Sequence, residues 1–509
     1  MIDSYFPLES GRFVAISASG DYVFLNQDEV DVVSRATESP DALKSLDLKL
    51  LADLYAKHFL PQSAGVGMQR LLQARIRARN ETLRSGASLH LIVPTLECEH
   101  SCKYCQVSRA VSSEGYSMTL DHIEAVANSI FESTAQVLTV EFQGGDPLLR
   151  FDLVKAAIDR IANLNKREKR KIKFVVASTL HQLSEEMCAF FKEHEVALST
   201  SIDGPAVVHN RNRPIPTRDS YERTIRGLTL AREKISPDCV SALMTVTRES
   251  LPYAQEIVDE YVRLGLDEIF IRPLAMYGFA KKNAQFQAYA FDDFERFYAA
   301  CLDRIFWWNQ NGYSIREAGA SIWMNKLLSP FDSGYMDLQS ESGAGSACVL
   351  YNYDGWIYPS DEARMLAEVG DKSLRLNRIG CSLMSIAQHS TAMRLQRESN
   401  GKNHEECAAC TFNVFCGPDL IELQSSGNNA KVASTWHCRR SKSMFGWILN
   451  RLDLATEQDD NTFIELAHAW ARRQHPSQRK SSDVLPNRAA EGGTPRGSAL
   501  PRIIPIYIV

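Results

Sequence analysis

The sequence predicts an α/β protein organised around a sheet of parallel strands. Short runs rich in β-branched and aromatic residues alternate with longer amphipathic stretches through the central part of the chain. Polar motifs rich in Cys, Gly, Ser and Asp directly follow several of these runs. Repeated strand–helix units build a parallel sheet or barrel, and in such folds the functional residues gather at the carboxyl ends of the strands.

Six runs are expected to form the strands, in the order Leu89–Val93, Val137–Phe142, Ile172–Ala177, Val196–Ile202, Val240–Val246 and Ile269–Arg272. Between the first two runs, apolar residues at helical spacing give a helix one buried face, made of Ile123, Val126, Ala127, Ile130 and Phe131. Helical segments also separate the later runs. Such crossovers return the chain to the same end of the sheet, as parallel pairing requires.

The composition indicates a globular chain of roughly three domains, at a typical domain size of about 150 residues. Of the 509 residues 44% are hydrophobic and 23% are charged, and the net charge is −5. This balance gives no basis for binding nucleic acid or an anionic membrane. No run reaches the roughly 18 apolar residues of a membrane span, and the amino terminus lacks a signal-peptide pattern. Twelve cysteines are too sparse for a disulfide scaffold, so we expect a cytoplasmic protein whose clustered cysteines bind metal.

The most informative motif follows the first predicted strand and contains Cys98, Cys102 and Cys105. Its CxxxCxxC spacing supplies three thiolates to one metal centre. A [4Fe–4S] cube held by three cysteines keeps one iron without a protein ligand, free to bind a small molecule. The alternatives are a zinc knuckle and reduced core cysteines, but structural zinc normally takes four protein ligands.

Later strand ends carry residues suited to a small polar ligand. They are Gly144, Gly145, Asp146 and Pro147 after the second strand, Ser178 after the third, and Ser201 and Arg213 at and beyond the end of the fourth. The two glycines admit a ligand close to the backbone, and the aspartate can accept hydrogen bonds from an ammonium group. The planar fork of an arginine suits a carboxylate. Plain turns and solvated charges are the alternative readings of these residues.

The cysteine motif, with the aromatic Tyr104 before its last cysteine, resembles the S-adenosylmethionine (SAM) site of the radical SAM superfamily. The resemblance implies a partial (β/α)6 barrel, a [4Fe–4S] cluster on the three cysteines, and SAM bound at the open iron. Gly144–Pro147 resembles the GGEP motif that binds the methionyl amino group of SAM, with Asp in place of the commoner Glu. Ser178 and Thr179 stand where relatives often have Thr-Asn, and their hydroxyls are expected to reach the ribose.

The stretch from Ser199 to Arg213 contains Ser-Ile-Asp-Gly-Pro followed by a histidine and an arginine. It resembles the signature of peptide-modifying radical SAM enzymes that carry a C-terminal SPASM-type extension. The resemblance implies that Ser201 and Arg213 contact the ribose and the carboxylate of SAM.

A second cysteine group lies past the predicted barrel, at Cys407, Cys410, Cys416 and Cys438. Four thiolates can close a [4Fe–4S] cluster or an all-cysteine zinc site. The spacing resembles the second auxiliary cluster of SPASM domains, which implies a second [4Fe–4S] cluster here.

The first auxiliary cluster of SPASM domains is expected to be missing, because Ser360 and Leu420 stand at two of its ligand positions. Cys348 and Cys381 are left without an assigned role. Asp361 stands where an aspartate of sulfatase-maturating relatives serves as the base on substrate, and the resemblance implies that catalytic role here.

We expect four regions: an N-terminal unit with its connector at residues 1–84, the barrel at 85–330, the SPASM-like extension at 331–475, and a disordered tail at 476–509. In the first region, strands at Phe13–Ser17 and Asp21–Leu25 precede helices near 27–36 and 48–58. This order resembles the winged-helix peptide-recognition modules of peptide-maturation systems, which add a leader peptide as a strand to a sheet edge. A structural cap on the barrel is the alternative.

Residues 60–470 as a whole most resemble the B-type radical SAM maturase of the His-Xaa-Ser peptide-modification system, through stretches such as EFQGGDPLLRFDL and YNYDGWIYPSDEARMLAE. This implies an enzyme that abstracts hydrogen from a side chain of a His-Xaa-Ser repeat protein. It also implies a second radical SAM partner and an electron donor such as flavodoxin or ferredoxin. The alternatives are single-residue oxidation, as in sulfatase maturases, and a non-catalytic iron–sulfur or zinc adaptor. An adaptor needs no SAM pocket, so the strand-end motifs argue against it.

Overall fold

The computed structural model describes residues 4–36, 39–60, 66–79, 81–112, 114–338, 341–427 and 430–473. The tail predicted to be disordered lies outside these residues. The chain divides into two compact units. What we call the sheet unit contains Ser85–Gly319 and Gly343–Arg394, and the helical unit contains Met1–Arg84, Ala320–Ser342 and the described part of Leu395–Asp483.

A nine-stranded sheet in the order β10-β9-β8-β7-β6-β5-β4-β11-β12 forms the core of the sheet unit. The six predicted strands are confirmed as β4 (Leu89–Thr95), β5 (Val137–Gly144), β6 (Lys171–Ala177), β7 (Ala197–Ser201), β8 (Val240–Thr245) and β9 (Glu268–Arg272). Each pairs in parallel with its neighbour. All seven residues of β4 are buried, as expected for a parallel strand that is covered on both faces.

Three short strands that the sequence analysis did not anticipate extend the sheet. β10 (Arg316–Glu317) pairs in parallel with β9, and β11 (Cys348–Tyr351) pairs in parallel with β4. β12 (Ile357–Tyr358) pairs antiparallel with β11. Strands of two to four residues are too short for a detectable period, so their place depends on the edges already present in the sheet.

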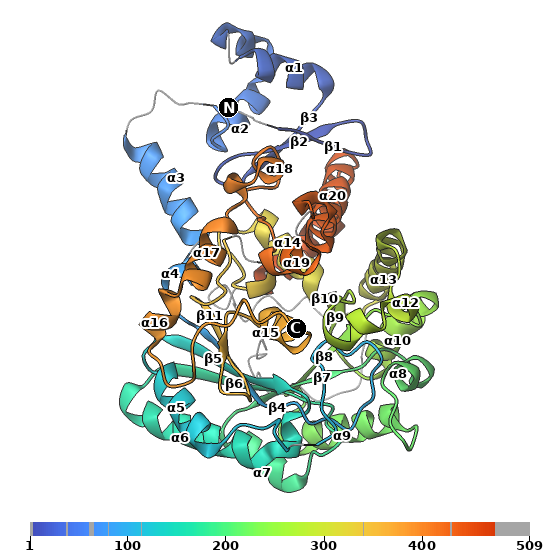
Figure 1. Ribbon diagram of the computed structural model, residues 1–509. Coiled ribbons are helices and arrows are strands. Elements are labelled where there is room, and N and C mark those ends of the chain that lie inside the picture. The colour runs from blue at the N-terminus through green and yellow to red at the C-terminus, as the bar shows by residue number, and fades with distance from the viewer. Residues whose placement is uncertain are drawn as a thin grey trace. The chain divides into compact units, whose positions relative to one another are not determined.

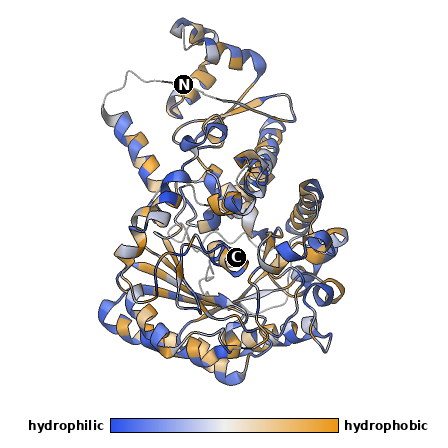
Figure 2. Ribbon diagram, viewed as in Figure 1, coloured by the Kyte–Doolittle hydropathy of each residue, from blue (hydrophilic) through white to orange (hydrophobic). Residues whose placement is uncertain are grey.

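Helices cover the sheet, and Figure 1 shows α5, α6, α7 and α9 side by side along one face of it. The helices of the sheet unit are α5 (Leu120–Ile130), α6 (Phe151–Glu168), α7 (Glu185–Glu193), α8 (Ala206–Asn212), α9 (Ser220–Lys234), α10 (Ala254–Arg263), α11 (Gly278–Lys282), α12 (Ala284–Gln287), α13 (Phe291–Gln310), α15 (Asp361–Glu368) and α16 (Leu383–Ala387). The predicted apolar face of α5 is buried at Ile123, Val126, Ala127 and Ile130. Figure 2 shows hydrophobic colour along the strands and both colours on the covering helices.

The helical unit begins with a three-stranded antiparallel sheet, β1 (Phe6–Pro7), β2 (Phe13–Ile16) and β3 (Tyr22–Leu25), in that order. The two predicted strands and the two predicted helices of this region are confirmed. The helices of this unit are α1 (Gln27–Arg35), α2 (Leu48–Ala56), α3 (Val66–Arg79), α4 (Glu81–Arg84), α18 (Glu405–Ala408), α19 (Leu420–Ser425), α20 (Trp436–Glu457) and α21 (Asn461–Arg473). Two further helices, α14 (Ala318–Leu328) and α17 (Ser390–Glu398), contain the points where the two units divide.

Within the helical unit, the N-terminal sheet packs on the segment that carries the second cysteine group. The ring of Phe6 lies 4.9 Å from that of Phe412, which stacks on Phe445 of α20, also at 4.9 Å. Arg12 donates to the buried Asp453 at 2.9 Å. These contacts join the first residues of the chain to its last described helices.

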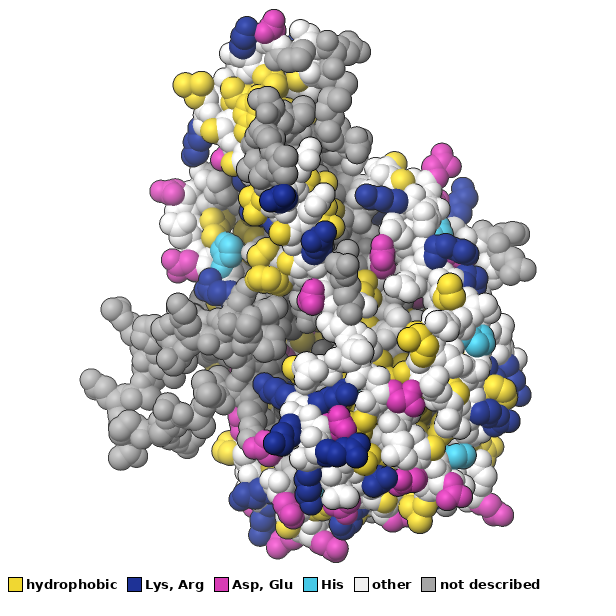
Figure 3. All heavy atoms as spheres, turned by 90° about the vertical axis from the view of Figure 1, so that its left-hand side faces the viewer, with side chains coloured by type: hydrophobic (Ala, Val, Ile, Leu, Met, Phe, Trp, Pro, Cys, Tyr) yellow, Lys and Arg dark blue, Asp and Glu magenta, His cyan; other side chains and the backbone are white. Residues whose placement is uncertain are grey.

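The surface drawn in Figure 3 carries Lys and Arg side chains interspersed with Asp and Glu. This mixture agrees with the small net charge of −5. None of the described helices is both long enough and apolar enough to cross a membrane.

Candidate active site

Cys98, Cys102 and Cys105 lie on the loop that follows β4, as predicted, and we call residues 98–105 the cysteine loop. Backbone hydrogen bonds hold this loop from several sides. The amide of Cys98 donates to the carbonyl of Ala110 at 3.1 Å, and the carbonyl of Cys105 accepts from the amide of Phe279, at the start of α11, at 2.9 Å. The cysteine loop is therefore fixed at both ends by other parts of the sheet unit.

Burial disfavours the ionised form of the thiols in this loop. Burial raises the pKa of Cys98 well above its usual range and that of Cys102 to about 12. A buried thiol ionises when a positive centre replaces its lost hydration, and iron is such a centre. Within the described residues, no three His, Cys, Asp or Glu side chains are arranged to hold a metal ion. The ligands of a four-iron cube are arranged differently from those of a single metal ion. The cysteines surround the volume of the cube and need not converge on one point.

Gly144 and Gly145 bring the end of β5 against the chain that leads into the cysteine loop. A Cβ on Gly145 would lie 2.1 Å from the carbonyl oxygen of Glu97, and one on Gly144 would lie 2.6 Å from that of Thr95. The amide of Gly145 donates to the carbonyl of Thr95 at 2.9 Å, and the amide of Asp146 donates to the carbonyl of Glu97 at 2.7 Å. Both glycines are thus required by a close backbone approach that positions Cys98, in addition to any ligand they admit.

Asp146 joins the ends of β5 and β6. It is buried and accepts hydrogen bonds from the Ser178 hydroxyl at 2.7 Å and from the Thr179 amide at 3.2 Å. Burial raises the pKa of Asp146, and the hydroxyls of Thr179 and Ser178 oppose that rise. Pro147 begins a short 3-10 turn that Asp146 caps at the amide of Leu148. The structure therefore brings together two of the motifs that the sequence predicted separately.

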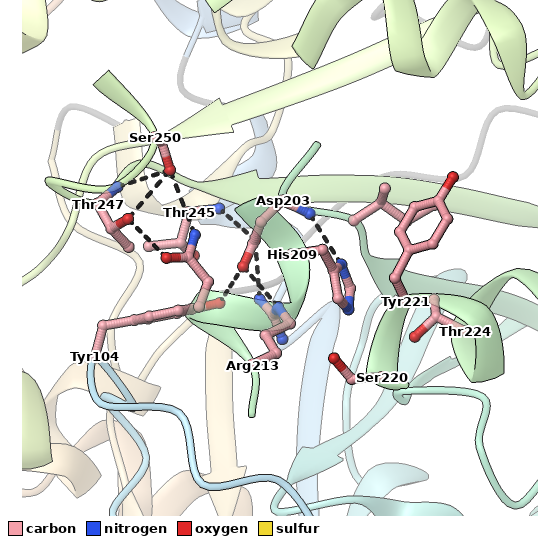
Figure 4. Close-up of polar contacts among 12 residues, drawn as sticks. Tyr104, Asp203, His209, Arg213, Ser220, Tyr221, Thr224, Thr245, Thr247 and Ser250 are labelled. Carbon is pink, nitrogen blue, oxygen red and sulfur yellow. Dashed lines mark hydrogen bonds and ion pairs between the residues drawn. The ribbon is translucent and has the colours of Figure 1, made fainter. Parts of the chain in front are cut away.

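A buried carboxylate, Asp203, connects the cysteine loop to the ends of β7 and β8 (Figure 4). It accepts a hydrogen bond from the Tyr104 hydroxyl at 2.7 Å and two from Arg213, from Nε at 2.9 Å and from Nη2 at 3.3 Å. The amide of Thr245 donates to it at 3.2 Å. Tyr104 and Arg213 are 109 residues apart in the sequence, and both bind this one side chain. The Arg213 guanidinium lies 5.4 Å from the Tyr104 ring centroid.

The charges of this group stabilise one another. Burial, the largest single effect, opposes ionisation of Asp203, but the charge of Arg213 acts together with His209 and with the hydrogen bonds from Arg213 and Tyr104 to hold the pKa of Asp203 below its ordinary value. Burial likewise acts against the charge of Arg213, and Asp203 raises the pKa of Arg213 in spite of it. Burial raises the pKa of Tyr104 well above its usual range, so its hydroxyl remains a donor. Asp203 engages Nε and Nη2 of Arg213, and Nη1 is the terminal nitrogen outside this pair.

The motif in this stretch predicted ligand contacts for Ser201 and Arg213 and assigned no role of its own to Asp203, for which a plain turn was the alternative. Ser201 is the last residue of β7 and is half-buried. His209, fully buried, accepts a hydrogen bond at Nδ1 from the amide of Asp203 at 3.3 Å. The signal for Asp203 was present in its motif, but its partner Tyr104 lies 99 residues away, and only the fold brings the two together.

The second cysteine group lines one hollow in the helical unit, which we call the cysteine hollow. Its cavity volume is about 30 Å³, and it is lined by Cys407, Cys410, Cys416 and Cys438, with Lys442 among the other lining residues. Burial raises the pKa of Cys407 to about 11 and that of Cys416 to about 12. Four thiols around one space fit a cluster with no open ligand position.

Asp361 begins α15 in the sheet unit and is buried. Its Oδ1 accepts a hydrogen bond from Nε of Arg364 at 2.7 Å, and the hydroxyl of Ser360 caps the same helix by accepting from the amide of Ala363 at 3.3 Å. Ser360 thus has a structural use at a position where a cluster ligand was expected to be missing.

Comparison with known proteins supplies the family context for this geometry. Residues 92–265 match the Radical SAM superfamily. A cysteine-type anaerobic sulfatase-maturating enzyme of Clostridium perfringens is 21% identical over 367 residues, which cover 70% of this chain and 94% of that enzyme. An uncharacterised protein of Methanothermobacter thermautotrophicus is 26% identical over 183 residues, which cover 35% of this chain and 64% of that protein. A second uncharacterised relative is covered over 44% of its length, so the chain spans about half of the first curated relatives it matches.

Two solved structures share the fold. Native anSMEcpe with bound AdoMet superimposes with a TM-score of 0.59 at 17% identity, covering 75% of this chain and 99% of that one. Streptococcus suis SuiB bound to its precursor peptide SuiA gives a TM-score of 0.52 at 14% identity, covering 84% of this chain and 98% of that one. The predicted α/β architecture with a sheet of mostly parallel strands is therefore confirmed.

Proposed function

We propose that this chain is a radical SAM enzyme that modifies a side chain of a peptide or protein. One observation carries the proposal. The cysteine loop, the Gly144–Asp146 segment and the Asp203–Arg213 pair converge at the carboxyl ends of β4, β5 and β7. The match of residues 92–265 to the Radical SAM superfamily and the shared fold of two structures, one with bound AdoMet and one with a precursor peptide, support it.

A [4Fe–4S] cluster held by Cys98, Cys102 and Cys105 would supply, with SAM bound, the radical chemistry that removes a hydrogen atom from the substrate. The chain's own residues bind and orient. Cys98, Cys102 and Cys105 are the proposed cluster ligands, and Arg213 offers a charge-assisted donor to the SAM carboxylate. The hydroxyls of Ser178 and Ser201 are the proposed ribose contacts, and the backbone of Gly144–Pro147 is the proposed cradle for the amino group.

Iron content and SAM cleavage test the assignment directly. Anaerobically reconstituted protein is expected to hold about eight irons in two cubes, and changing Cys98, Cys102 and Cys105 together to Ala should leave about four. The same variant should form no 5′-deoxyadenosine. Changing the buried core cysteines Cys188 and Cys239 to Ala gives the matched control, which should keep all the iron. Continued 5′-deoxyadenosine formation by the triple variant would refute the proposal.

The N-terminal sheet is the proposed docking site for a leader peptide. β3 is an edge strand, since no other strand pairs with its outer side among the described residues. The amide of Ser17 donates to the carbonyl of Asp21 at 2.8 Å, so alternation along the antiparallel ladder points the backbone groups of Tyr22 and Phe24 outward. The carbonyl of Tyr22 does point outward, because it accepts from the Lys57 ammonium at 3.1 Å. An added strand would pair with these outward groups.

The proposed substrate is a His-Xaa-Ser repeat protein, with a second radical SAM protein as partner and flavodoxin or ferredoxin as electron donor, in the cytoplasm. The second candidate is single-residue oxidation, which the similarity to a sulfatase-maturating enzyme over 94% of that enzyme favours. Incubating the reconstituted protein with each type of peptide and measuring the product mass separates the two. A mass change confined to the cysteine-containing sulfatase-type peptide would overturn the first choice in favour of the second.

The cysteine hollow is the proposed site of a second [4Fe–4S] cluster, which would accept or relay an electron from the substrate radical. All four of its proposed ligand positions are cysteines, so no iron is left open for direct substrate binding. Its loss should therefore stop product formation and leave SAM cleavage intact.

A further inference from the structure

Asp361 and Arg364 form an ion pair that is closed off from solvent. The two residues lie three positions apart on α15, and the Nε–Oδ1 distance is 2.7 Å. Their side chains are 1% and 0% exposed. Burying such a pair costs hydration that the attraction between the charges often fails to recover, so stability alone is a poor explanation for it.

Arg364 reaches from α15 to the backbone just beyond the cysteine loop. Its Nη1 donates to the carbonyl of Val107, two residues after Cys105, at 3.2 Å. α11 contacts the same backbone segment. The amide of Phe279 donates to the carbonyl of Cys105, and a Cβ on Gly278 would lie 2.1 Å from the carbonyl oxygen of Gln106. α11 in turn packs against α15. The backbone from Cys105 to Val107 is therefore held between two helices.

We propose that Asp361 and Arg364 are a positioning pair for the cysteine loop. Asp361 orients the guanidinium, Arg364 holds the carbonyl of Val107, and Cys105 is thereby held at the angle that the cluster requires. This role replaces that of a base on the substrate, which calls for a carboxylate that the substrate can reach. The oxygen of Asp361 already serves Arg364, and the side chain is 1% exposed. The inference rests on the proposed function only for the identity of the group that the loop binds.

Arginine suits this position because its donors are fixed in one plane. Nε serves Asp361 while Nη1 serves Val107, and a lysine has a single nitrogen that cannot take both places. Nη2 is buried and has no hydrogen-bond partner in the described part of the chain. Asp361 raises the pKa of Arg364 against the effect of burial, and Cys105 also acts on it electrostatically. A permanent positive charge therefore lies within reach of one of the proposed cluster ligands.

Hydrogen exchange of the metal-free chain tests the positioning role without any cofactor. The variants are Arg364→Lys, Asp361→Asn and the two combined, with Arg375→Lys as the matched control. Arg375 belongs to the same unit and pairs with Asp354 at 3.1 Å and with the Tyr358 hydroxyl at 2.9 Å. Backbone amides in peptides covering residues 105–112 should exchange roughly tenfold faster in each single variant, since each loses a charge-assisted hydrogen bond. The control and peptides from β6 should exchange as in the unaltered chain.

Cluster retention gives the second readout. A chelator should strip iron from the reconstituted single variants several-fold faster than from the unaltered protein, and the double variant should be no worse than either single one, because the two residues act as a unit. Should Asp361→Asn fail to fold by circular dichroism, Arg364→Lys, which keeps the charge beside Asp361, decides the matter alone.

Two results would overturn the inference. One is unchanged exchange and iron retention in folded Arg364→Lys. The other is the signature of a base: Asp361→Asn loses product while exchange, iron retention and SAM cleavage stay normal. If the unaltered protein bound no cluster, the proposed function would be wrong. Hydrogen exchange of the metal-free chain would still test whether Asp361 and Arg364 position the cysteine loop.

Discussion

Replacing Asp203 by Asn should destabilise the sheet unit and weaken SAM binding together. The substitution keeps the shape of the side chain and removes its charge, which leaves the guanidinium of Arg213 without a counter-charge. The side chain of Asp203 is fully buried and that of Arg213 is 13% exposed. Breaking a buried ion pair by removing one partner costs about 3–5 kcal/mol. We expect about 3 kcal/mol, because the asparagine oxygen still accepts one hydrogen bond and Arg213 keeps slight contact with water.

The pH dependence gives the same prediction a second test. Burial raises the pKa of Asp203, but Arg213, His209 and the hydrogen bond from Tyr104 together hold it below its ordinary value in the folded chain. A carboxyl whose pKa is depressed by folding stabilises the fold above its unfolded pKa, and this stabilisation disappears as pH falls through the folded pKa. The unaltered chain should therefore lose this contribution below about pH 4, the ordinary pKa of Asp. The difference in stability between it and Asp203→Asn should shrink over the same range.

Urea unfolding at pH 7 measures the effect, with hydrogen exchange of strand amides used to assign the transition to the sheet unit. The control is Asp159→Asn, which breaks the half-exposed pair with Lys155 at 2.6 Å. That pair should contribute less than about 0.5 kcal/mol, because solvent screens it. A loss below about 1 kcal/mol in Asp203→Asn, or one no larger than in the control, would refute the reasoning that this ion pair organises the site.

Three further outcomes are expected. Phe24→Pro removes an outward amide of β3 and should weaken binding of the substrate's leader peptide, measured by titration calorimetry. The control variant Phe24→Val keeps this amide and should bind the leader peptide normally. Equal binding by both variants would assign the N-terminal sheet to a capping role. Folded Cys410→Ala/Cys416→Ala should cleave SAM and form no product by mass spectrometry, and a normal yield from protein shown to lack that cluster would disprove the electron-exchange role. Gly145→Ala should lower the free energy of unfolding by about 1–3 kcal/mol and reduce the iron content, because its Cβ would lie 2.1 Å from the carbonyl oxygen of Glu97. Normal iron content would show that this backbone approach does not position the cysteine loop.

The strand ends show how far local patterns reach. The sequence places Cys98 after one strand and Asp146 after the next, and both positions are confirmed because strand length and turn residues are encoded within a few residues of each other. The reason for Gly145 was only partly visible. The sequence analysis assigned it to ligand approach, and the structure adds a backbone contact with Glu97, which lies in a different strand–helix unit.

The roles of Asp203 and Asp361 could not be predicted from their local sequence. Each is an aspartate in a recognisable motif. The motif of Asp203 assigned that residue no role of its own, and the motif of Asp361 implied a catalytic base. The structure places one at the junction of Tyr104 and Arg213 and pairs the other with Arg364. What a carboxylate does depends on which donors surround it and how much water reaches it, and neither property is encoded by its immediate neighbours.

The sequence by itself determined the α/β class, the six central strands and the two cysteine groups, because hydrophobic period and ligand spacing are local properties of the chain. Only the tertiary structure decided that β10, β11 and β12 extend the sheet, and that Asp203 joins the cysteine loop to Arg213. Strands of two to four residues and a hydrogen bond across 99 residues leave no local trace. They form because packing of the larger elements has already brought the partners together, and burial then makes every unpaired polar group costly.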